Sequence, residues 1–206
     1  MKNKFHTVLA CTALVFIGIE IMLIIGSWII SSVFPSLHIR SILSSVGIRW
    51  LLGGMVDNIC SPLLVYIMVL ASSIGAMIRS GIGKDVRRIA QKKVLSFRSK
   101  LGMVLISAEV FVVTLVMMML TILPHAILHN VEGDLFPSSF SSSLIPVASL
   151  MLSLCATTYG IITERFSNIA QWFGFFCYGL SKCSGIIVIY LIFIELFSTI
   201  RFIFIL

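Results

Sequence analysis

Five long apolar segments decide what this chain can fold into. Each comes close to the ~20 apolar residues that a helix needs to cross the ~30 Å hydrocarbon core of a bilayer. The predicted spans are Val8–Ile30, Pro62–Ile78, Leu101–Leu123, Leu144–Ile162 and Ser184–Leu206. Because lipid offers no hydrogen-bond partners to a free backbone, such segments fold as helices. We therefore predict an all-α integral membrane protein in which residues 1–206 form a single transmembrane domain.

The composition and charge of the chain exclude several classes of protein. Hydrophobic residues make up 59% of the 206 residues and charged residues only 11%, whereas a soluble domain has about 25% charged residues. The net charge is +7, but eight of the 15 Lys and Arg residues lie in Arg79–Lys100, between two apolar segments. A basic segment beside a membrane span is typical of a topogenic signal. We therefore predict that these basic residues lie beside a lipid bilayer and do not bind a nucleic acid.

The distribution of Lys and Arg also predicts an orientation. With the N-terminus in the cytoplasm, the inner side of a five-span protein carries twelve of these residues, including Lys182, and the outer side three, including Arg201. This bias follows the positive-inside rule. The hydrophobic stretch continues past the faint lipoprotein-like sequence Val8–Cys11, so the first helix is predicted to stay uncleaved. We expect a multi-pass protein of the inner (cell) membrane.

Two of the connections are predicted to form interfacial amphipathic helices. Within residues 40–58, Ile42, Val46 and Trp50 share one helical face, with Trp50 placed at headgroup depth. A re-entrant segment is the alternative there, because two adjacent glycines follow. Residues 164–181 are also amphipathic and hold a cluster of aromatic residues, as expected of an aromatic belt. By contrast, Pro124–Ser143 contains no Lys or Arg and is predicted to be an exposed loop.

Three glutamates near the middle of separate spans are the candidate functional residues. Glu20, Glu109 and Glu195 account for three of only eight acidic residues. A charge at mid-bilayer costs at least ~2.5–3.5 kcal/mol, so each carboxylate requires a proton, a partner, a water-filled cavity or a bound ion. One interpretation is a site that couples transport to protons or cations. The other is a set of protonated glutamates that hydrogen-bond between helices as assembly contacts.

Small residues spaced one helical turn apart indicate close helix packing. Such residues let two helices approach closely in a membrane, within one chain or at the seam of a homo-oligomer. The helix-packing candidates are Ala71, Gly75, Ser149, Ser153, Ala156 and Gly160.

The sequence contains no positive indication of an enzyme. We find no nucleophile–base pair, phosphate-binding loop or zinc-ligand spacing, and the five cysteines form no CxxC pair. His125, His129, Glu132 and Asp134 lie in the predicted outer loop and are expected to be solvated rather than to bind a metal. We therefore predict no catalytic residues, no metal and no cofactor.

Two blocks of the sequence resemble the AbgT family of p-aminobenzoyl-glutamate transporters. The first block, Ser41–Gly83, contains the GIRW and MVDN sequences before a span that begins with proline. The second block, Leu144–Leu180, contains a span that ends in YGI and an amphipathic stretch after it. The two blocks cover under half of the chain.

The resemblance implies a transporter-related function. Members of the family are larger secondary transporters with nine spans and two re-entrant hairpins, and they are usually dimers. They carry p-aminobenzoyl-glutamate inward, and some export sulfonamide-like drugs. The hairpins that hold the substrate have no recognisable counterpart here, so no substrate-binding residue is carried over. The resemblance implies a small organic anion as substrate and a homo-oligomer or a partner membrane protein. The alternative is a non-transporting subunit that scaffolds a larger complex.

Overall fold

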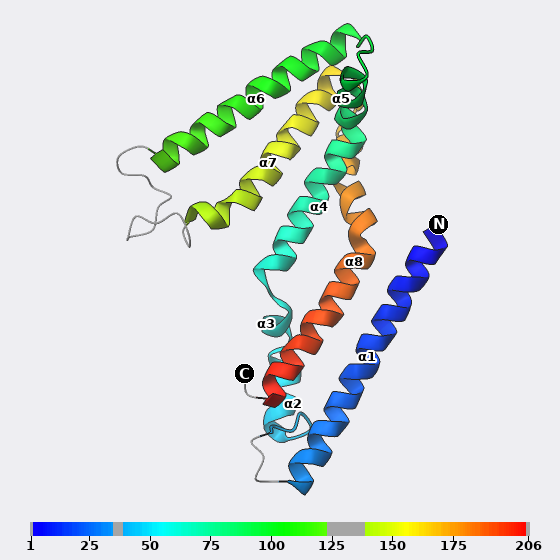
Figure 1. The fold of residues 1–206 in the computed structure, drawn as a ribbon, viewed down its shortest axis with the longest axis vertical. Helices are drawn as coiled ribbons and strands as arrows, with labels where there is room; N and C mark the ends of the chain where they lie inside the picture. Colours follow the sequence, from blue (N-terminus) through cyan, green and yellow to red (C-terminus); the bar gives the residue numbers. More distant parts are fainter. Residues whose placement is uncertain (1, 35–38, 123–138, 205–206) are drawn as a thin grey trace. The chain divides into compact units, whose positions relative to one another are not determined.

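The protein is built from helices throughout the residues that the structure describes. The computed structural model describes residues 2–34, 39–122 and 139–204, and every regular element in these ranges is a helix (Figure 1). The elements are α1 (Lys2–Val33), α2 (Ser45–Gly53), α3 (Met55–Ile59), α4 (Pro62–Ser80), α5 (Ile82–Ala90), α6 (Phe97–Ile122), α7 (Ser139–Ile162) and α8 (Ile169–Phe204). The predicted all-α fold class is confirmed.

Five of these helices, α1, α4, α6, α7 and α8, are long and apolar enough to cross a membrane. Each of them overlaps one of the five predicted spans, as expected of a multi-pass membrane protein. The last of them, α8, has 36 residues. At 1.5 Å per residue its length is about 54 Å, well beyond the ~30 Å hydrocarbon core. A single crossing therefore accounts for only part of α8.

The chain divides into two compact units where the sequence predicts one domain. Unit 1 consists of Met1–Val65 and Ser184–Leu206, and unit 2 consists of Tyr66–Cys183. Both boundaries fall inside helices, one near the start of α4 and the other within α8.

Unit 1 is organised by the contact between α1 and the C-terminal half of α8. The rings of Phe16 and Phe193 lie 5.8 Å apart, and further along both helices Ile24 packs against the buried apolar cluster that contains Phe202 and Ile203. Since the contacts advance in the same direction along both sequences, the two helices run parallel. A chain with five spans gives its first and last helices this relation. A small apolar core forms around Ile42, Phe202 and Ile203.

The segment between α1 and α4 folds into two short helices. The hydroxyl of Ser44 caps α2 by accepting the backbone N–H of Gly47 at 3.1 Å. Gly47 is required there, because a Cβ would lie 2.3 Å from the carbonyl oxygen of Ile42. Gly54 separates α2 from α3. The two helices occupy the region predicted to be amphipathic, residues 40–58.

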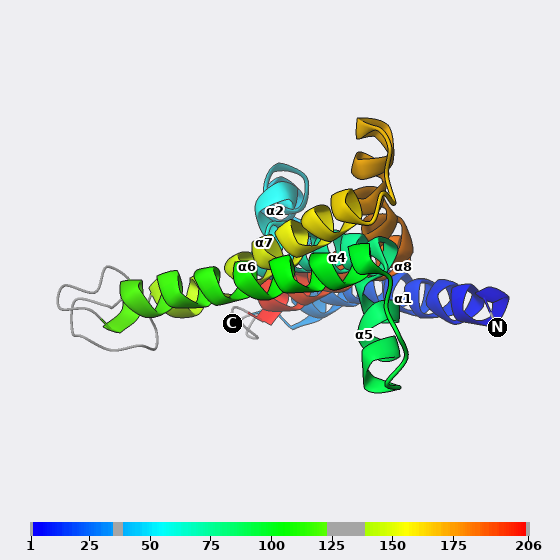
Figure 2. The same cartoon turned by 90° about the horizontal axis from the view of Figure 1, so that it is seen from above.

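Unit 2 contains two antiparallel helix pairs. The first half of α8 lies along α4, where a Cβ on Gly75 would lie 2.2 Å from Gly179 Cα. Nearby, the Ser72 hydroxyl donates to the carbonyl oxygen of Phe176 at 3.4 Å. The other pair is α6 and α7, which lie side by side in both views (Figures 1 and 2). Tyr159 of α7 packs there against Gly102 of α6.

A proline inside α7 leaves a backbone group that a tyrosine satisfies. Pro146 has no N–H and therefore cannot bond the carbonyl oxygen of Ser142, four residues earlier. The Tyr66 hydroxyl of α4 donates to this oxygen at 3.4 Å. This bond joins the start of α7 to the start of α4 within unit 2.

The second predicted interfacial helix, residues 164–181, does not form as a separate element. After a turn, α8 begins at Ile169 and continues to Phe204 without interruption. Asn168 caps its start by accepting the N–H of Gln171 at 2.9 Å, and no proline follows to end the helix. Lys182 consequently lies inside α8 and not in a connection.

The boundaries of α7 also differ from expectation. This helix begins at Ser139, so residues 139–143 are helical rather than part of the predicted outer loop. His125, His129, Glu132 and Asp134 lie outside the described residues.

Candidate functional site

Glu20 and Glu195 come together in unit 1. The rings of Phe16 on α1 and Phe193 on α8 are in contact. Glu20 follows Phe16 by four residues and Glu195 follows Phe193 by two, so both glutamates lie just beyond this contact. Glu195 is only 9% exposed, and neither of its carboxylate oxygens has a hydrogen-bond partner in the described part of the chain.

The surroundings of this pair supply no counter-charge. Among the described residues, no Lys or Arg forms an ion pair with either glutamate. Two neighbouring ionised carboxylates repel strongly where the dielectric constant is low. Within a span, the Glu20–Glu195 pair therefore requires a proton or a bound cation.

A polar face of α8 extends from Glu195 toward the end of the helix. Ser198, Thr199 and Phe202 follow Glu195 at helical spacings of three, four and seven residues, so the four side chains share one face. The hydroxyl of Thr199 is buried and has no partner among the described residues. Ser198 donates to the carbonyl oxygen of Asn58 at 3.3 Å. This face connects the carboxyl pair with a cavity.

The cavity has a volume of about 500 Å³, within the size range typical of small-molecule sites. It lies in unit 1 between α2, α3 and the last two turns of α8. Its lining residues are Arg40, Val46, Trp50, Asn58, Ser198, Arg201 and Phe202. No acidic residue lines it.

The charged side chains that line the cavity, Arg40 and Arg201, are hydrogen-bond donors only. Neither Arg40 nor Arg201 forms an ion pair with a described residue. The side-chain nitrogen of Asn58 is buried and has no hydrogen-bond acceptor in the described ranges. Trp50 and Phe202 stack with their ring centres 4.5 Å apart, and the Arg40 guanidinium lies 5.9 Å from the Phe202 ring.

This arrangement suits an organic anion with a flat apolar part. A guanidinium binds a carboxylate through two parallel hydrogen bonds, and a buried amide donor without a partner favours a ligand that supplies an acceptor. The aromatic wall of Trp50 and Phe202 offers a surface for an apolar or aromatic group. No covalent chemistry is indicated by these residues.

Glu109 has a different environment in unit 2. Its Oε1 accepts a hydrogen bond from the Thr158 hydroxyl, which joins α6 to α7. Its other oxygen, Oε2, is buried and has no partner among the described residues. The structure thus places Glu20 and Glu195 in one unit and Glu109 in the other.

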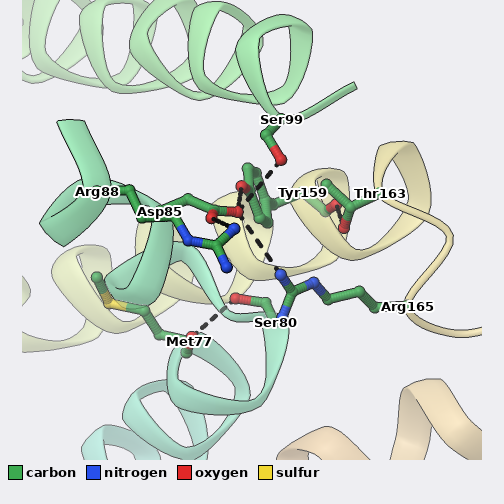
Figure 3. Close-up of polar contacts among 8 residues, drawn as sticks. All are labelled: Met77, Ser80, Asp85, Arg88, Ser99, Tyr159, Thr163 and Arg165. Atoms are coloured by element: carbon green, nitrogen blue, oxygen red, sulfur yellow. Dashed lines mark hydrogen bonds and ion pairs between the residues drawn. The ribbon is translucent and has the colours of Figure 1, made fainter. Parts of the chain in front are cut away.

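A polar cluster in unit 2 surrounds the buried side chain of Asp85 (Figure 3). Asp85 of α5 is 1% exposed and accepts hydrogen bonds from Tyr159 of α7 and from Ser99 of α6, the latter at 3.2 Å. Arg88 and Arg165 approach the same carboxylate at 3.1 and 3.6 Å. One aspartate therefore holds α5, α6, α7 and the turn before α8 together.

The carboxylate of Asp85 is stabilised in its ionised form. Burial alone would raise its pKa, but the hydrogen bonds from Tyr159 and Ser99 and the charges of Arg88 and Arg165 outweigh burial and lower the pKa. Asp85 lies outside the candidate spans and stays charged at neutral pH.

The small residues singled out in the sequence lie in unit 2. Ala71 and Gly75 of α4 meet Gly179 of α8, where a Cβ on Gly179 would overlap the Ala71 carbonyl oxygen. On α7, Ala156 packs with Ala76 and Phe175, and Gly160 contacts the Phe166 ring. Ser149 is fully buried and bonds its own helix, and Ser153 accepts the hydroxyl hydrogen of Thr157 through its carbonyl oxygen.

Sequence reasoning missed Asp85 and the convergence of Arg40, Asn58 and Arg201. Asp85 sits in a basic, polar stretch, and its partners Ser99 and Tyr159 lie 14 and 74 residues away. A turn at Gly81 was the indication that the sequence offered, because glycine readily adopts the left-handed backbone (φ 78°) that separates α4 from α5. Arg201 was expected to reach the outer interface, and its place beside Arg40 follows from tertiary packing.

No protein-family model, curated protein or solved structure matches the chain.

Proposed function

We propose that this membrane protein moves a small organic anion across the bilayer and couples the movement to protons. The observation that carries the proposal is the cavity of unit 1, which is lined by Arg40, Arg201, a stacked aromatic pair and Asn58, whose amide nitrogen has no partner among the described residues. Glu195 lies about one helical turn before the first cavity residue of α8, Ser198. In this proposal the anion site and the titrating carboxyl group share one face of α8, which supports their coupling.

The resemblance to AbgT transporters supports the choice of ligand. p-Aminobenzoyl-glutamate combines an aromatic ring with carboxylates, which are the groups that the cavity lining complements. In this proposal the protein resides in the inner membrane with a cytoplasmic N-terminus. It works as a homo-oligomer or with a partner membrane protein, because the hairpins that the resemblance would imply have no recognisable counterpart among the described residues.

Equilibrium binding to the purified protein tests the anion site. Labelled p-aminobenzoyl-glutamate is expected to bind the wild type, and Arg201→Gln is expected to weaken binding by about 10–100-fold, since a charge-assisted hydrogen bond contributes ~1.5–3 kcal/mol. Arg49→Gln is the matched control, because it removes one charge from α2 of the same unit without altering the cavity lining. Equal binding by the two variants would refute the assigned site.

A scaffold subunit is the second candidate. The most apolar stretches of α1 and α6 contain no residue that is buried in the described part of the protein, so both helices leave much of their apolar surface uncovered. Lipid or a helix of another subunit would cover this surface. Purification in mild detergent separates the two candidates, because a scaffold is expected to bring a stoichiometric partner and a transporter to form a partner-free particle.

A further inference from the structure

A second cavity, in unit 2, carries a cationic lining that the proposed anion transport does not use. It has a volume of about 510 Å³ and lies where α4 ends and α8 begins. Its lining residues are Arg79, Arg165, Asn168, Ala170, Gln171, Gly174 and Phe175. No acidic side chain lines it.

Apart from Arg165, which is paired with Asp85, the donors of this cavity have no acceptor in the described part of the chain. Arg79 forms no ion pair with a described residue, and its guanidinium lies 5.4 Å from both the Phe175 and Tyr178 rings. The side-chain oxygen of Asn168 accepts the N–H of Gln171, and that of Gln171 accepts the N–H of Ser167, each at 2.9 Å. The two side-chain NH₂ groups therefore remain as donors for a ligand.

The second arginine, Arg165, is held in place by the Asp85 cluster (Figure 3). Arg165 lies 3.6 Å from the Asp85 carboxylate, and its Nη1 occupies the space that a side chain at Gly81 would fill, 1.8 Å from an added Cβ. Because Arg88 also pairs with Asp85, one carboxylate serves two guanidinium groups. Asp85 therefore compensates the charge of Arg165 only in part, and the guanidinium of Arg165 still attracts an anion in the cavity.

The position of the cavity along the helices identifies a membrane edge. Arg79 is the penultimate residue of the candidate span Pro62–Ser80, and Arg165 follows the end of Ser139–Ile162 by three residues. Arg87 and Arg88 stand on the adjacent α5, which is exposed and basic on its surface. Phosphate groups of lipids lie at the ends of membrane spans, and basic pockets between spans bind anionic headgroups.

We propose that this cavity binds a phosphate group, presented by the headgroup of an anionic phospholipid. Two guanidinium groups and two amide NH₂ groups match the acceptor oxygens of a phosphate. The Phe175 ring beside them gives the acyl end of such a lipid an apolar contact. A free phosphate anion has the same chemistry, so the experiment compares the two sources.

Native mass spectrometry of the full chain in detergent tests the proposal. Phosphatidylglycerol is expected to remain bound at least tenfold more tightly than phosphatidylcholine with the same acyl chains. Arg79→Gln is expected to weaken phosphatidylglycerol binding about tenfold, the effect of losing ~1.4 kcal/mol. Arg87→Gln is the matched control, because it removes an equal charge from an exposed position that does not line the cavity.

Further arms of the experiment separate the sources and guard against misfolding. Inorganic phosphate competing at millimolar concentration would identify the free anion as a ligand of the same site, whereas phosphatidylglycerol retained in its presence identifies the lipid. If Arg79→Gln does not accumulate, Arg79→Lys keeps the charge without the guanidinium fork and is expected to bind phosphatidylglycerol more weakly than the wild type. Equal losses in Arg79→Gln and Arg87→Gln, or equal binding of the two lipids, would overturn the proposal. Transport by unit 1 is independent of either result.

Discussion

The Tyr159 hydroxyl donates a hydrogen bond to the buried carboxylate of Asp85, across 74 residues of sequence. Asp85 lies on the short helix α5, and Tyr159, which is fully buried, lies near the end of α7. Ser99, at the start of α6, donates to the same carboxylate. The end of α4, the start of α6 and the end of α7 therefore lie on one side of unit 2. Three consecutive spans that alternate in direction have this arrangement.

Replacement of this aspartate should loosen unit 2. Asp85→Asn removes the charge that Arg88 and Arg165 share, so we expect a loss of about 1–3 kcal/mol of stability at neutral pH. Thermal unfolding in detergent measures this loss. Asp57→Asn, at an exposed position on α3, is the control and should leave the melting temperature unchanged.

The effect of Asp85→Asn should also depend on pH. Because the pKa of Asp85 is lowered in the folded protein, its stabilising contribution is complete above the unfolded pKa of ~3.9 and is lost as the pH falls through the lower folded pKa. The difference in melting temperature between wild type and variant should therefore be constant from neutral pH down to about pH 4 and shrink below it. A difference that already disappears between pH 7 and pH 5 would contradict this account of the cluster.

The contact between α4 and α8 should be intolerant of a methyl group. In Gly75→Ala the new Cβ would meet backbone atoms of Gly179, which cannot move away as a side chain can, so we expect a loss of about 1–3 kcal/mol. Chemical denaturation followed by circular dichroism measures it. Gly18→Ala is the control, since no atom lies within 4 Å of an added Cβ there, and it should cause no loss.

Replacing Glu195 and replacing Glu109 should have different effects on the stability of the protein. Glu195 makes no hydrogen bond to a described residue, so Glu195→Leu should unfold at the same or a higher temperature than the wild type. Glu109→Leu removes the acceptor of Thr158 and should cost about 1 kcal/mol. A marked destabilisation by Glu195→Leu would instead support the assembly role of this residue.

Much of the architecture could be predicted from hydrophobicity, because a long run of apolar residues indicates a membrane-spanning helix whatever the helix packs against. The same reasoning located Glu20 and Glu195, since a carboxyl group in an apolar run is visible without any knowledge of packing. It failed for residues 164–181, where the aromatic cluster indicated an interfacial helix and the chain instead continues into α8.

The side chains that converge from distant segments could not be predicted. Arg40 and Arg201 line one cavity because the N–H of Arg40 bonds the carbonyl oxygen of Ile203, a contact of the folded chain only. Asp85 resembles a surface aspartate in the sequence, because charged neighbours surround it on both sides. Its burial depends on Ser99 and Tyr159, which no local pattern links to it.

Uptake of labelled p-aminobenzoyl-glutamate into proteoliposomes under an imposed proton gradient tests the central claim most directly. The wild type is expected to accumulate the label only when the gradient is present, and Glu195→Gln should abolish that accumulation without lowering the amount of folded protein. Glu164→Gln, an exposed acid after α7, should transport as the wild type does. No uptake above that of protein-free vesicles, or gradient-driven uptake by Glu195→Gln equal to the wild type, would contradict the account.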